Sequence, residues 1–311
     1  MSTLLLAAIV PAGFAAAIAA AHAGGAAAPL WGAVVTLTLL AGWLVARLAA
    51  LGGGGGWHGR ALALLAPLGF GALVVVLWEV LVVGLAVPMV LLPAPSAVAM
   101  RLAASAPLLA QDFVQTFVKA VLAGYVLGGL LGFAVALLAD RLPFLGRGLL
   151  PVANFVSALP VIGIAPIMVM WFGFDWQSKA AVVVVMTFFP MLVNTLAGLA
   201  AAGAQERDLM RSYAASHAQT LWLVRLPAAL PFIFTALKIN APLALIGAII
   251  AEFFGSPTTG MGFRITTEAA KLALDLVWAE IVVAAVAGTV FYGLVVLAER
   301  AATFWHPSMQ A

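Results

Sequence analysis

The sequence predicts an all-α, polytopic membrane bundle of about eight spans, with two N-terminal helices ahead of a six-helix core. Two observations support this fold class. Of the 311 residues, 65% are hydrophobic and only 8% are charged, whereas roughly a quarter of the residues in a soluble domain carry a charge. Apolar stretches of about 20 residues also recur along the chain, and a helix of that length crosses a hydrocarbon core of about 30 Å.

The apolar stretches place the spans near residues 4–21, 31–50, 63–86, 113–138, 149–172, 179–202, 233–254 and 279–298. Between the second and third spans, five consecutive glycines occupy positions 52–56. Glycine has little helix propensity, and a run of it behaves as a flexible joint. We therefore predict an N-terminal two-helix extension with a Gly-rich linker over residues 1–60, and a main transmembrane domain over residues 61–311.

The first span is predicted to be retained as a helix. A cleaved signal peptide is the alternative, because Ala21-His22-Ala23 resembles a small-x-small cleavage site. Against cleavage, Met1-Ser2-Thr3 contains no Lys or Arg, and a second span follows at once.

Basic residues favour an orientation with both termini in the cytoplasm. Nine then fall on the inner side, namely Arg47, Arg60, Arg141, Arg147, Arg207, Arg211, Arg225, Lys238 and Arg300. Five fall outside, namely Arg101, Lys119, Lys179, Arg264 and Lys271. Cytoplasmic loops carry an excess of Lys and Arg, so we predict a multi-pass membrane protein in this orientation.

Several chemistries lack their signatures. The net charge of +3 requires no nucleic-acid partner, and with no cysteine there is neither a disulfide nor a thiolate metal site. The four histidines show no metal-ligand spacing, so we predict no metal site. No Gly-x-Ser-x-Gly elbow and no Gly-Lys pair of a phosphate-binding loop occur. We therefore expect no catalytic residue and no ATP site in this chain.

The segment over residues 203–231 is the longest charged stretch between spans. Its apolar side chains can share one helical face, namely Leu209, Met210, Tyr213, Leu221 and Val224. Asp208 suits a helix N-terminus, where a carboxylate accepts unpaired backbone N–H groups. Pro227 and Pro231 are expected to stop this helix and lead into the next span. An interfacial helix lying on lipid is the alternative.

This segment resembles the cytoplasmic loop of bacterial ABC importer permeases, whose pattern is Glu-Ala-Ala, three residues, Gly, nine residues, Ile, one residue, Leu-Pro. Here the same register reads Asp208-Leu209-Met210, three residues, Ala214, nine residues, Val224, Arg225, Leu226-Pro227. Only Leu226-Pro227 is identical. If the glycine position requires a positive φ, Ala214 costs about 1 kcal/mol or more. The alternatives are that the turn is more helical in this chain, or that position 214 does not need a positive φ.

Three further stretches are similar to the nitrate/sulfonate/taurine-type branch of that family. They are Leu92-Pro93-Ala94-Pro95-Ser96-Ala97-Val98, then Trp171-Phe172-Gly173-Phe174 with Lys179 shortly after, and Ala251-Glu252-Phe253-Phe254-Gly255-Ser256 with Gly260-Met261-Gly262 beyond it. The resemblance covers roughly residues 62–300 and leaves out the two N-terminal helices.

The resemblance implies the permease subunit of an ATP-driven importer in the bacterial inner membrane, which is a transport subunit and not an enzyme. Its loop would be a coupling helix docked on a cytoplasmic ATPase subunit that binds the ATP, so this chain itself would bind no cofactor. The residues implied in coupling are Asp208, Leu209, Met210, Arg211, Tyr213, Ala214, Ala215, Ser216, Leu221, Leu226 and Pro227. Other implied partners are an extracytoplasmic solute-binding protein, the lipid bilayer and a second permease copy, most simply as a homodimer. The implied solute is a small organic or inorganic anion or a vitamin-precursor pyrimidine.

Polar side chains within the predicted spans are candidates for the solute pathway, because such groups are costly in a membrane. They are Asn154, Ser157, Asn194, Thr195 and Asn240. Hydrogen bonding between helices is the alternative for each. Gly124, Gly128 and Gly132 recur at every fourth residue, which favours close helix packing within the chain over a dimer seam.

Two other functions remain as alternatives. An ATP-independent secondary transporter would show central carboxylates or two related halves with broken helices, and the sequence shows neither. A non-transporting membrane scaffold would leave the polar segment 203–231 without a partner.

Overall fold

The computed structural model describes residues 28–51, 57–157, 159–256 and 258–305, together with Ala12, Gly13, Ala16 and Ala19. Every regular element in this part of the chain is a helix. Five helical stretches are long and apolar enough to cross a membrane, namely Pro67–Gly84, Ala106–Arg141, Trp176–Ala200, His217–Glu252 and Leu274–Ala302. The predicted all-α polytopic fold class is therefore confirmed.

The predicted spans compare with these helices as follows. Five of the predicted spans overlap the five long helical stretches, namely those near 63–86, 113–138, 179–202, 233–254 and 279–298. The predicted span at 31–50 corresponds to α2 (Ala28–Leu51). The span at 4–21 lies almost entirely outside the described residues. The total of eight spans stays a prediction.

The prediction of one span over 149–172 is wrong. The chain forms two helices there, α7 (Pro143–Ser157) and α8 (Val161–Phe172). Pro160 stands between them with an extended backbone, φ −69° and ψ 126°. A proline ring also disfavours helical backbone in the residue before it, so the helix is interrupted at this point.

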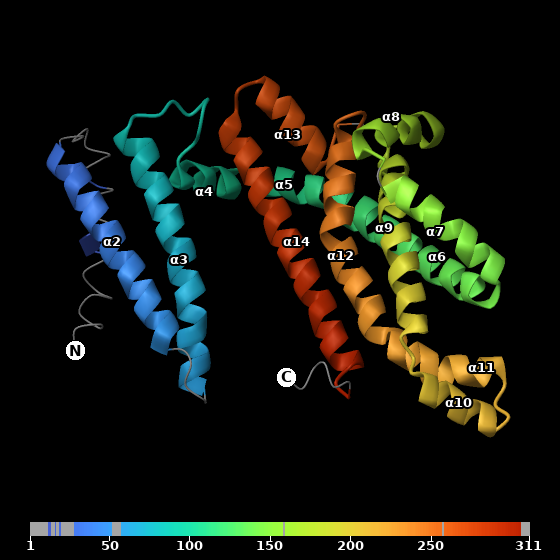
Figure 1. Ribbon diagram of the computed structural model, residues 1–311. Helices are drawn as coiled ribbons and strands as arrows, with labels where there is room; N and C mark the ends of the chain where they lie inside the picture. Colours follow the sequence, from blue (N-terminus) through green and yellow to red (C-terminus); the bar gives the residue numbers. More distant parts are fainter. Residues whose placement is uncertain are drawn as a thin grey trace. The chain divides into compact units, whose positions relative to one another are not determined.

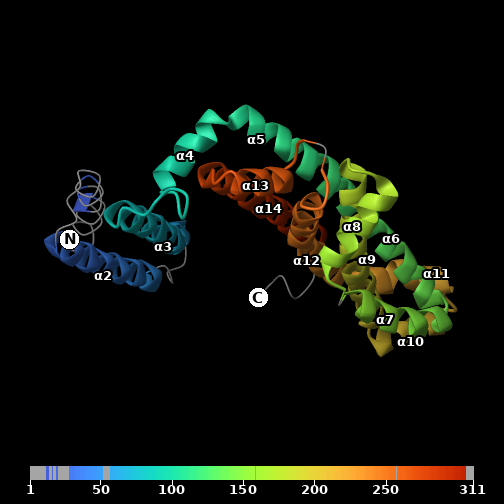
Figure 2. The ribbon, with the colours of Figure 1, turned by 90° about the horizontal axis from the view of Figure 1, so that it is seen from above.

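The chain divides into two compact units. The first comprises residues 1–104 with 272–279, and holds α2, α3 (Trp57–Gly84) and α4 (Pro95–Ala104). In this unit α2 lies beside α3 (Figure 2), and Ala41 packs among Leu37, Leu73 and Leu77. The predicted domain boundary falls in the glycine run at 52–56, which is outside the described residues, and it stays a prediction.

The Leu92–Val98 stretch of the first unit has a clear structural role. Glu79, near the end of α3, accepts hydrogen bonds from the backbone N–H of Ser96 at 2.9 Å and from its hydroxyl at 2.8 Å. Ser96 lies in the first turn of α4, where backbone N–H groups lack helical partners. Glu79 therefore caps α4 and holds it at the end of α3.

The second unit comprises residues 105–271 with 280–311. It begins with a continuous helical run of α5 (Ala106–Phe113), η1 (Val114–Val121) and α6 (Leu122–Arg141). It continues through α7 and α8 to α9 (Trp176–Ala200), α12 (Leu226–Glu252), α13 (Met261–Ala270) and α14 (Leu274–Ala302), the last of which starts in the first unit.

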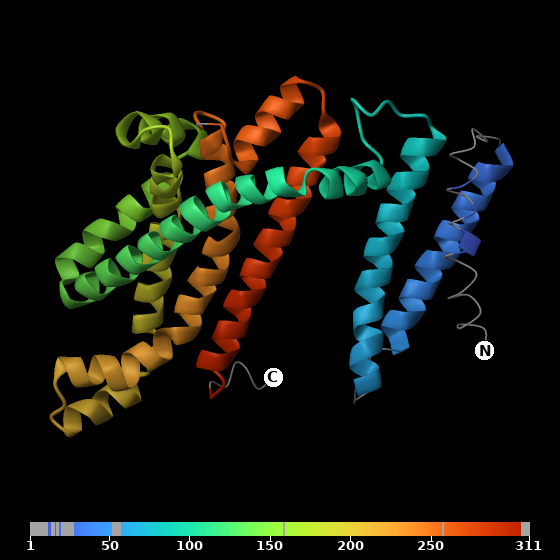
Figure 3. The same cartoon turned by 180° about the vertical axis from the view of Figure 1, so that it is seen from behind.

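Helix α9 is the centre of this second unit, because both α6 and α12 pack along it (Figure 3). The core is built largely from small side chains, among them Ala120, Val183, Ala244 and Ala248, and the Tyr125 ring packs edge-on against Phe291. The face of α6 that carries Gly124, Gly128 and Gly132 lies against α9. Packing of these glycines within the chain is therefore confirmed.

Candidate functional site

The segment after α9 folds as a helical hairpin, defined here as residues 204–225. It contains α10 (Ala204–Ser212), α11 (His217–Thr220) and η2 (Leu221–Arg225), which runs directly into α12. Figure 1 shows α10 and α11 side by side, beyond the end of α9 and the start of α12. No residue of these three elements is buried. The hairpin therefore projects from the unit and keeps its shape mainly through local bonds.

The turn of the hairpin is a Schellman motif with alanine at the left-handed position. Ala214 has φ +53°. Its N–H donates to the Arg211 carbonyl at 2.9 Å, and the Ala215 N–H donates to the Met210 carbonyl at 3.0 Å. This pair of bonds satisfies the last carbonyls of α10. The position thus does adopt the conformation that favours glycine, and the alternative of a more helical turn is excluded.

Glycine at position 214 is expected to stabilise the hairpin, because an L-residue in the left-handed region costs roughly 1–2 kcal/mol. Ala214→Gly should slow amide hydrogen exchange across residues 204–220 by about fivefold, which corresponds to about 1 kcal/mol. The control is Ala215→Gly, one residue on and outside the positive-φ positions, which should not slow exchange. Unchanged or faster exchange in Ala214→Gly would contradict the expectation.

The second helix of the hairpin starts with a capping box. The Ser216 hydroxyl accepts from the Gln219 N–H at 3.2 Å, and the Gln219 side-chain oxygen accepts from the Ser216 N–H at 2.7 Å. These reciprocal bonds satisfy two donors that a helix start leaves unpaired. Both ends of the turn are therefore fixed by local hydrogen bonds, without a buried core beneath them.

The structure places the predicted coupling residues along the whole hairpin. Asp208, Leu209, Met210 and Arg211 lie in α10, Tyr213, Ala214 and Ala215 in the turn, Ser216 at the N-cap of α11, Leu221 in η2, and Leu226 and Pro227 at the start of α12.

Three local predictions for this segment are wrong. Asp208 lies inside α10, which begins at Ala204, and its carboxylate pairs with Arg211 at 2.9 Å. The five apolar side chains do not share one helical face, because the turn at residues 213–216 reverses the chain between them. Pro227 and Pro231 do not stop a helix but lie in the first turns of α12, which continues from η2 without a break.

The hairpin exposes large apolar side chains. Leu209 is 55% exposed, Tyr213 76%, Trp222 61% and Leu223 68%. Trp222 and Leu223 are not among the residues predicted from the sequence, because a single helical face through Leu221 and Val224 does not include them.

Arg225 fixes the base of the hairpin, a role that the sequence did not reveal. Its two terminal nitrogens donate to the two carboxylate oxygens of Asp140 at 2.8 and 2.6 Å. Its Nε donates to the carbonyl of Leu199 at 3.1 Å. Asp140 lies in the last turn of α6 and Leu199 in the last turn of α9. One guanidinium therefore joins the hairpin to the ends of two membrane helices.

A buried polar cluster lies at the other end of α12. The Glu252 carboxylate accepts from the Thr116 hydroxyl and from the Gly262 N–H, both at 2.7 Å. Asp112 accepts from the Gly260 N–H at 2.6 Å and from Arg264 Nε at 2.8 Å. The N–H groups of the N-cap Gly260 and of Gly262 at the start of α13 are thus satisfied by carboxylates, which a helix N-terminus favours, and the N–H of Met261 donates to the Thr116 hydroxyl at 2.8 Å.

This arrangement explains two of the sequence stretches. The Ala251–Ser256 and Gly260–Gly262 segments form the two sides of the cluster. Gly260 has φ +134°, and a Cβ there would lie 2.6 Å from the Glu252 carboxylate, so only glycine fits. Glu280 of α14 is fully buried beside Asp112.

The Trp171–Phe174 stretch ends α8 and begins the turn that leads to α9. Lys179 is buried and donates from Nζ to the carbonyl of Phe174 at 2.6 Å. Asp175 caps α9 through the Trp176 N–H at 2.8 Å and accepts from the Gln115 amide at 2.7 Å. The Gln115 bond, followed by the Trp176 bond, holds the pKa of Asp175 below its ordinary value.

Among the pathway candidates, the three whose side chains the structure describes, Asn194, Thr195 and Asn240, line neither of the two cavities described below. Asn240 is fully buried and donates to the Thr187 carbonyl at 2.8 Å, which ties α12 to α9. Asn194 donates to the carbonyl of Pro190 in its own helix at 2.8 Å, and Thr195 is buried beside Met191. The side chains of Asn154 and Ser157 lie outside the described part of the structure, although the backbone of both belongs to α7. A pathway role for the five stays a prediction.

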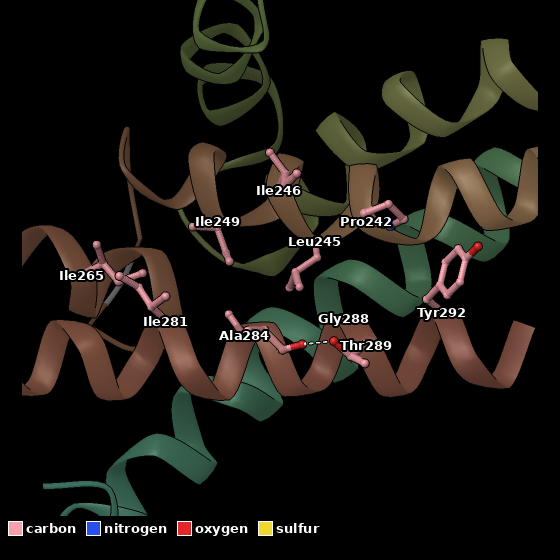
Figure 4. Close-up of a pocket in the computed structure, with 11 residues that line it drawn as sticks. Pro242, Leu245, Ile246, Ile249, Ile265, Ile281, Ala284, Gly288, Thr289 and Tyr292 are labelled. Atoms are coloured by element: carbon pink, nitrogen blue, oxygen red, sulfur yellow. Dashed lines mark hydrogen bonds between the residues drawn. The ribbon is translucent and has the colours of Figure 1, made fainter. Parts of the chain in front are cut away.

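Two cavities of the second unit have largely apolar linings. One of about 600 Å³ lies between α12, α13 and α14 (Figure 4) and is lined by Pro242, Leu245, Ile246, Ile249, Ile265, Ile281, Ala284, Ala285, Gly288, Thr289 and Tyr292. The Thr289 hydroxyl bonds to the Ala285 carbonyl of its own helix at 2.8 Å. A second cavity, of about 370 Å³, lies among α6, α9 and α12, where the Tyr125 hydroxyl bonds to the Leu237 carbonyl at 3.0 Å. Neither lining offers a polar solute a set of polar partners.

Comparison with known proteins decides what this hairpin-bearing bundle is. Residues 124–303 match the family described as binding-protein-dependent transport system inner membrane component. The chain belongs to this family. It is a permease subunit of an ATP-driven importer, a multi-pass protein of the inner membrane and a transport subunit, not an enzyme. The matched range of the permease includes α6, α9, the hairpin, α12, α13 and α14.

Individual relatives agree with this family. The permease is 32% identical over 222 residues to a probable ABC transporter permease protein of Haemophilus influenzae, which covers 71% of this chain and 90% of that protein. It is 34% identical to the formylaminopyrimidine transport permease protein of Halalkalibacterium halodurans, over 66% of this chain and 81% of that protein. It is 35% identical to the taurine transport system permease protein of Escherichia coli, over 53% of this chain and 60% of that protein.

Proposed function

We propose that the hairpin is the site at which a cytoplasmic ATPase subunit grips this permease. The observation that supports it is a segment of well-capped helices that buries none of its own residues and exposes Leu209, Tyr213, Trp222 and Leu223. Exposed Tyr and Trp side chains on a preformed scaffold are frequent anchors of a protein interface. A segment shaped by local bonds also docks without a large ordering cost.

The solute pathway is proposed to form between two copies of this chain, with an extracytoplasmic binding protein delivering the solute. Support comes from the apolar linings of the cavities described above, which suit helix packing better than a polar solute. Asn194, Thr195 and Asn240, with Asn154 and Ser157, are the proposed polar contributions from each copy. In this arrangement both termini and the hairpin face the cytoplasm, and ATP is bound and hydrolysed by the partner.

The solute is proposed to be a small organic or inorganic anion or a vitamin-precursor pyrimidine. This rests on relatives that are named for taurine, aliphatic sulfonates, bicarbonate and formylaminopyrimidine. Selectivity is expected to lie largely with the binding protein.

Replacing residues 208–221 with a Gly/Ser linker of equal length is the test of docking. The ATPase subunit should co-purify with the unmodified permease and be lost from the variant, and ATP-dependent uptake into vesicles should stop. A finer variant, Leu209→Ala with Tyr213→Ala, should weaken ATPase binding by about tenfold or more, as for interface anchors.

The matched control is Leu91→Ala, because Leu91 is also an exposed apolar side chain, 69% exposed, but lies in the loop after α3. It should leave ATPase binding and uptake unchanged. Normal co-purification and uptake in the linker variant would refute docking at the hairpin.

A further inference from the structure

We infer that Arg225 is a positioning residue that transmits movement of the hairpin to the ends of α6 and α9, and so sets how efficiently ATP hydrolysis drives transport. The inference rests on the proposed function, because it takes the hairpin as the element that the ATPase moves. It concerns a different step, however. Docking depends on the exposed side chains of the hairpin, whereas transmission depends on what holds its base.

The geometry of Arg225 suits a mechanical joint. The guanidinium makes two parallel bonds to Asp140 and a third to the Leu199 carbonyl. A planar bidentate pair fixes direction as well as distance. The side chains are only 15% and 12% exposed, in contrast to 80% and 68% for the Arg211–Asp208 pair on the hairpin surface. Exposed pairs of the latter kind contribute little, since water screens them.

The position of each partner in the chain adds a second argument. Arg225 is the last residue of η2, Asp140 is the second-last residue of α6, and Leu199 is the second-last residue of α9. Carbonyls in the last turn of a helix lack helical partners, and a cation there is favourable. A carboxylate in that turn is unfavourable by itself, so Asp140 depends on the guanidinium. The three helix ends are therefore held together by one side chain.

The Arg225–Asp140 ion pair connects the hairpin to α6. The hairpin is connected covalently to α9 and α12, because it lies between them in sequence, but α6 ends more than sixty residues earlier. The ion pair with Asp140 links the base of the hairpin to α6 directly. A displacement of the hairpin should then move the ends of α6, α9 and α12 together. Without Arg225, only the covalent connections to α9 and α12 would transmit the displacement.

The test uses the complete transporter, with binding protein and ATPase subunits, in vesicles. Three quantities are measured: ATPase co-purification, the rate of ATP hydrolysis, and the number of solute molecules imported per ATP hydrolysed. Arg225→Gln should leave co-purification intact and lower the imported solute per ATP by roughly three- to thirtyfold, the range for residues that carry coupling between sites. Arg225→Lys keeps the positive charge but cannot make two parallel bonds to Asp140. Its number of solute molecules imported per ATP should lie between the values of Arg225→Gln and the unmodified permease.

A double-mutant cycle tests whether Arg225 acts through Asp140. Asp140→Asn should also lower the solute imported per ATP, and adding it to Arg225→Gln should cause no further loss, because Arg225→Gln already removes the shared interaction. Lys238→Gln is the matched control, since Lys238 pairs with Glu299 at 2.7 Å and is also partly shielded, on the same helix as the hairpin's exit. It should leave the solute imported per ATP unchanged.

Three outcomes would overturn the inference: an unchanged ratio in Arg225→Gln, independent additive losses in the double variant, or an equal loss in Lys238→Gln. Loss of ATPase binding in Arg225→Gln together with normal binding in the linker variant would count against both the inference and the proposed docking site. Normal docking at the hairpin with an unchanged ratio in Arg225→Gln would overturn the inference alone.

Discussion

Asp112→Ala is expected to destabilise the permease by about 3–5 kcal/mol, the cost of breaking a buried ion pair by removing one partner. Asp112 is fully buried. Its loss would leave the Arg264 guanidinium, which is only 14% exposed, without its 2.8 Å partner and the Gly260 N–H without its acceptor. The first turn of α13 would then lose one of the two carboxylates that cap it.

The measurement is the thermal midpoint of the purified permease in detergent, followed by the fraction that remains monodisperse after heating. Lys271→Ala serves as the control, because Lys271 pairs with Glu268 but its side chain is 66% exposed. An exposed pair contributes about 0–1 kcal/mol, so this midpoint should hardly move. Equal midpoints for Asp112→Ala and Lys271→Ala would contradict the assigned role of the cluster.

Gly128→Leu is expected to disrupt the packing of α6 on α9. A Cβ on Gly128 would lie 2.8 Å from the Val184 carbonyl oxygen and 3.0 Å from its Cα, and would also meet the Thr187 hydroxyl. Backbone atoms cannot rotate away as a flexible side chain can, so the two helices would have to separate. Overpacking of this kind costs about 3 kcal/mol or more, and much of the variant should fail to accumulate as folded protein.

Gly293→Leu is the matched control, because nothing lies within 4 Å of a Cβ at that position in α14. Both variants add the same apolar side chain to a membrane helix. Folded yield and thermal midpoint should therefore fall for position 128 and stay near the unmodified values for position 293. Similar values for both would mean that α6 and α9 do not approach as closely as described.

The position of the proposed docking segment could be predicted from the sequence, because the spacing from Asp208 to Leu226-Pro227 is a local pattern. The turn at Ala214 and the capping pair Ser216–Gln219 were not predicted, although their hydrogen bonds join residues only three to five apart. What failed was the assumption of one continuous helix. The sequence could not show which of the permitted local conformations the segment takes, because the difference between a helical and a left-handed alanine is only about 1–2 kcal/mol.

The long-range partners could not be predicted. Arg225 and Asp140 are 85 residues apart, and Gly260 and Asp112 are 148 apart. A charged residue in an apolar chain indicates that a partner exists, but the choice among eleven acids and fourteen Lys and Arg residues depends on how the helices cross. The same holds for Asn240, whose hydrogen bond to α9 became visible only once α12 was placed beside it.

The amino-acid sequence by itself determined the membrane class, the helical fold and the family, since apolar run length and motif spacing are properties of adjacent residues. The tertiary structure alone decided that the hairpin stands on an Arg225–Asp140 base and that carboxylates cap α13. Such contacts depend on the relative positions of helices. Those positions follow from many weak packing interactions across the bundle. They therefore cannot be predicted from any short stretch of sequence.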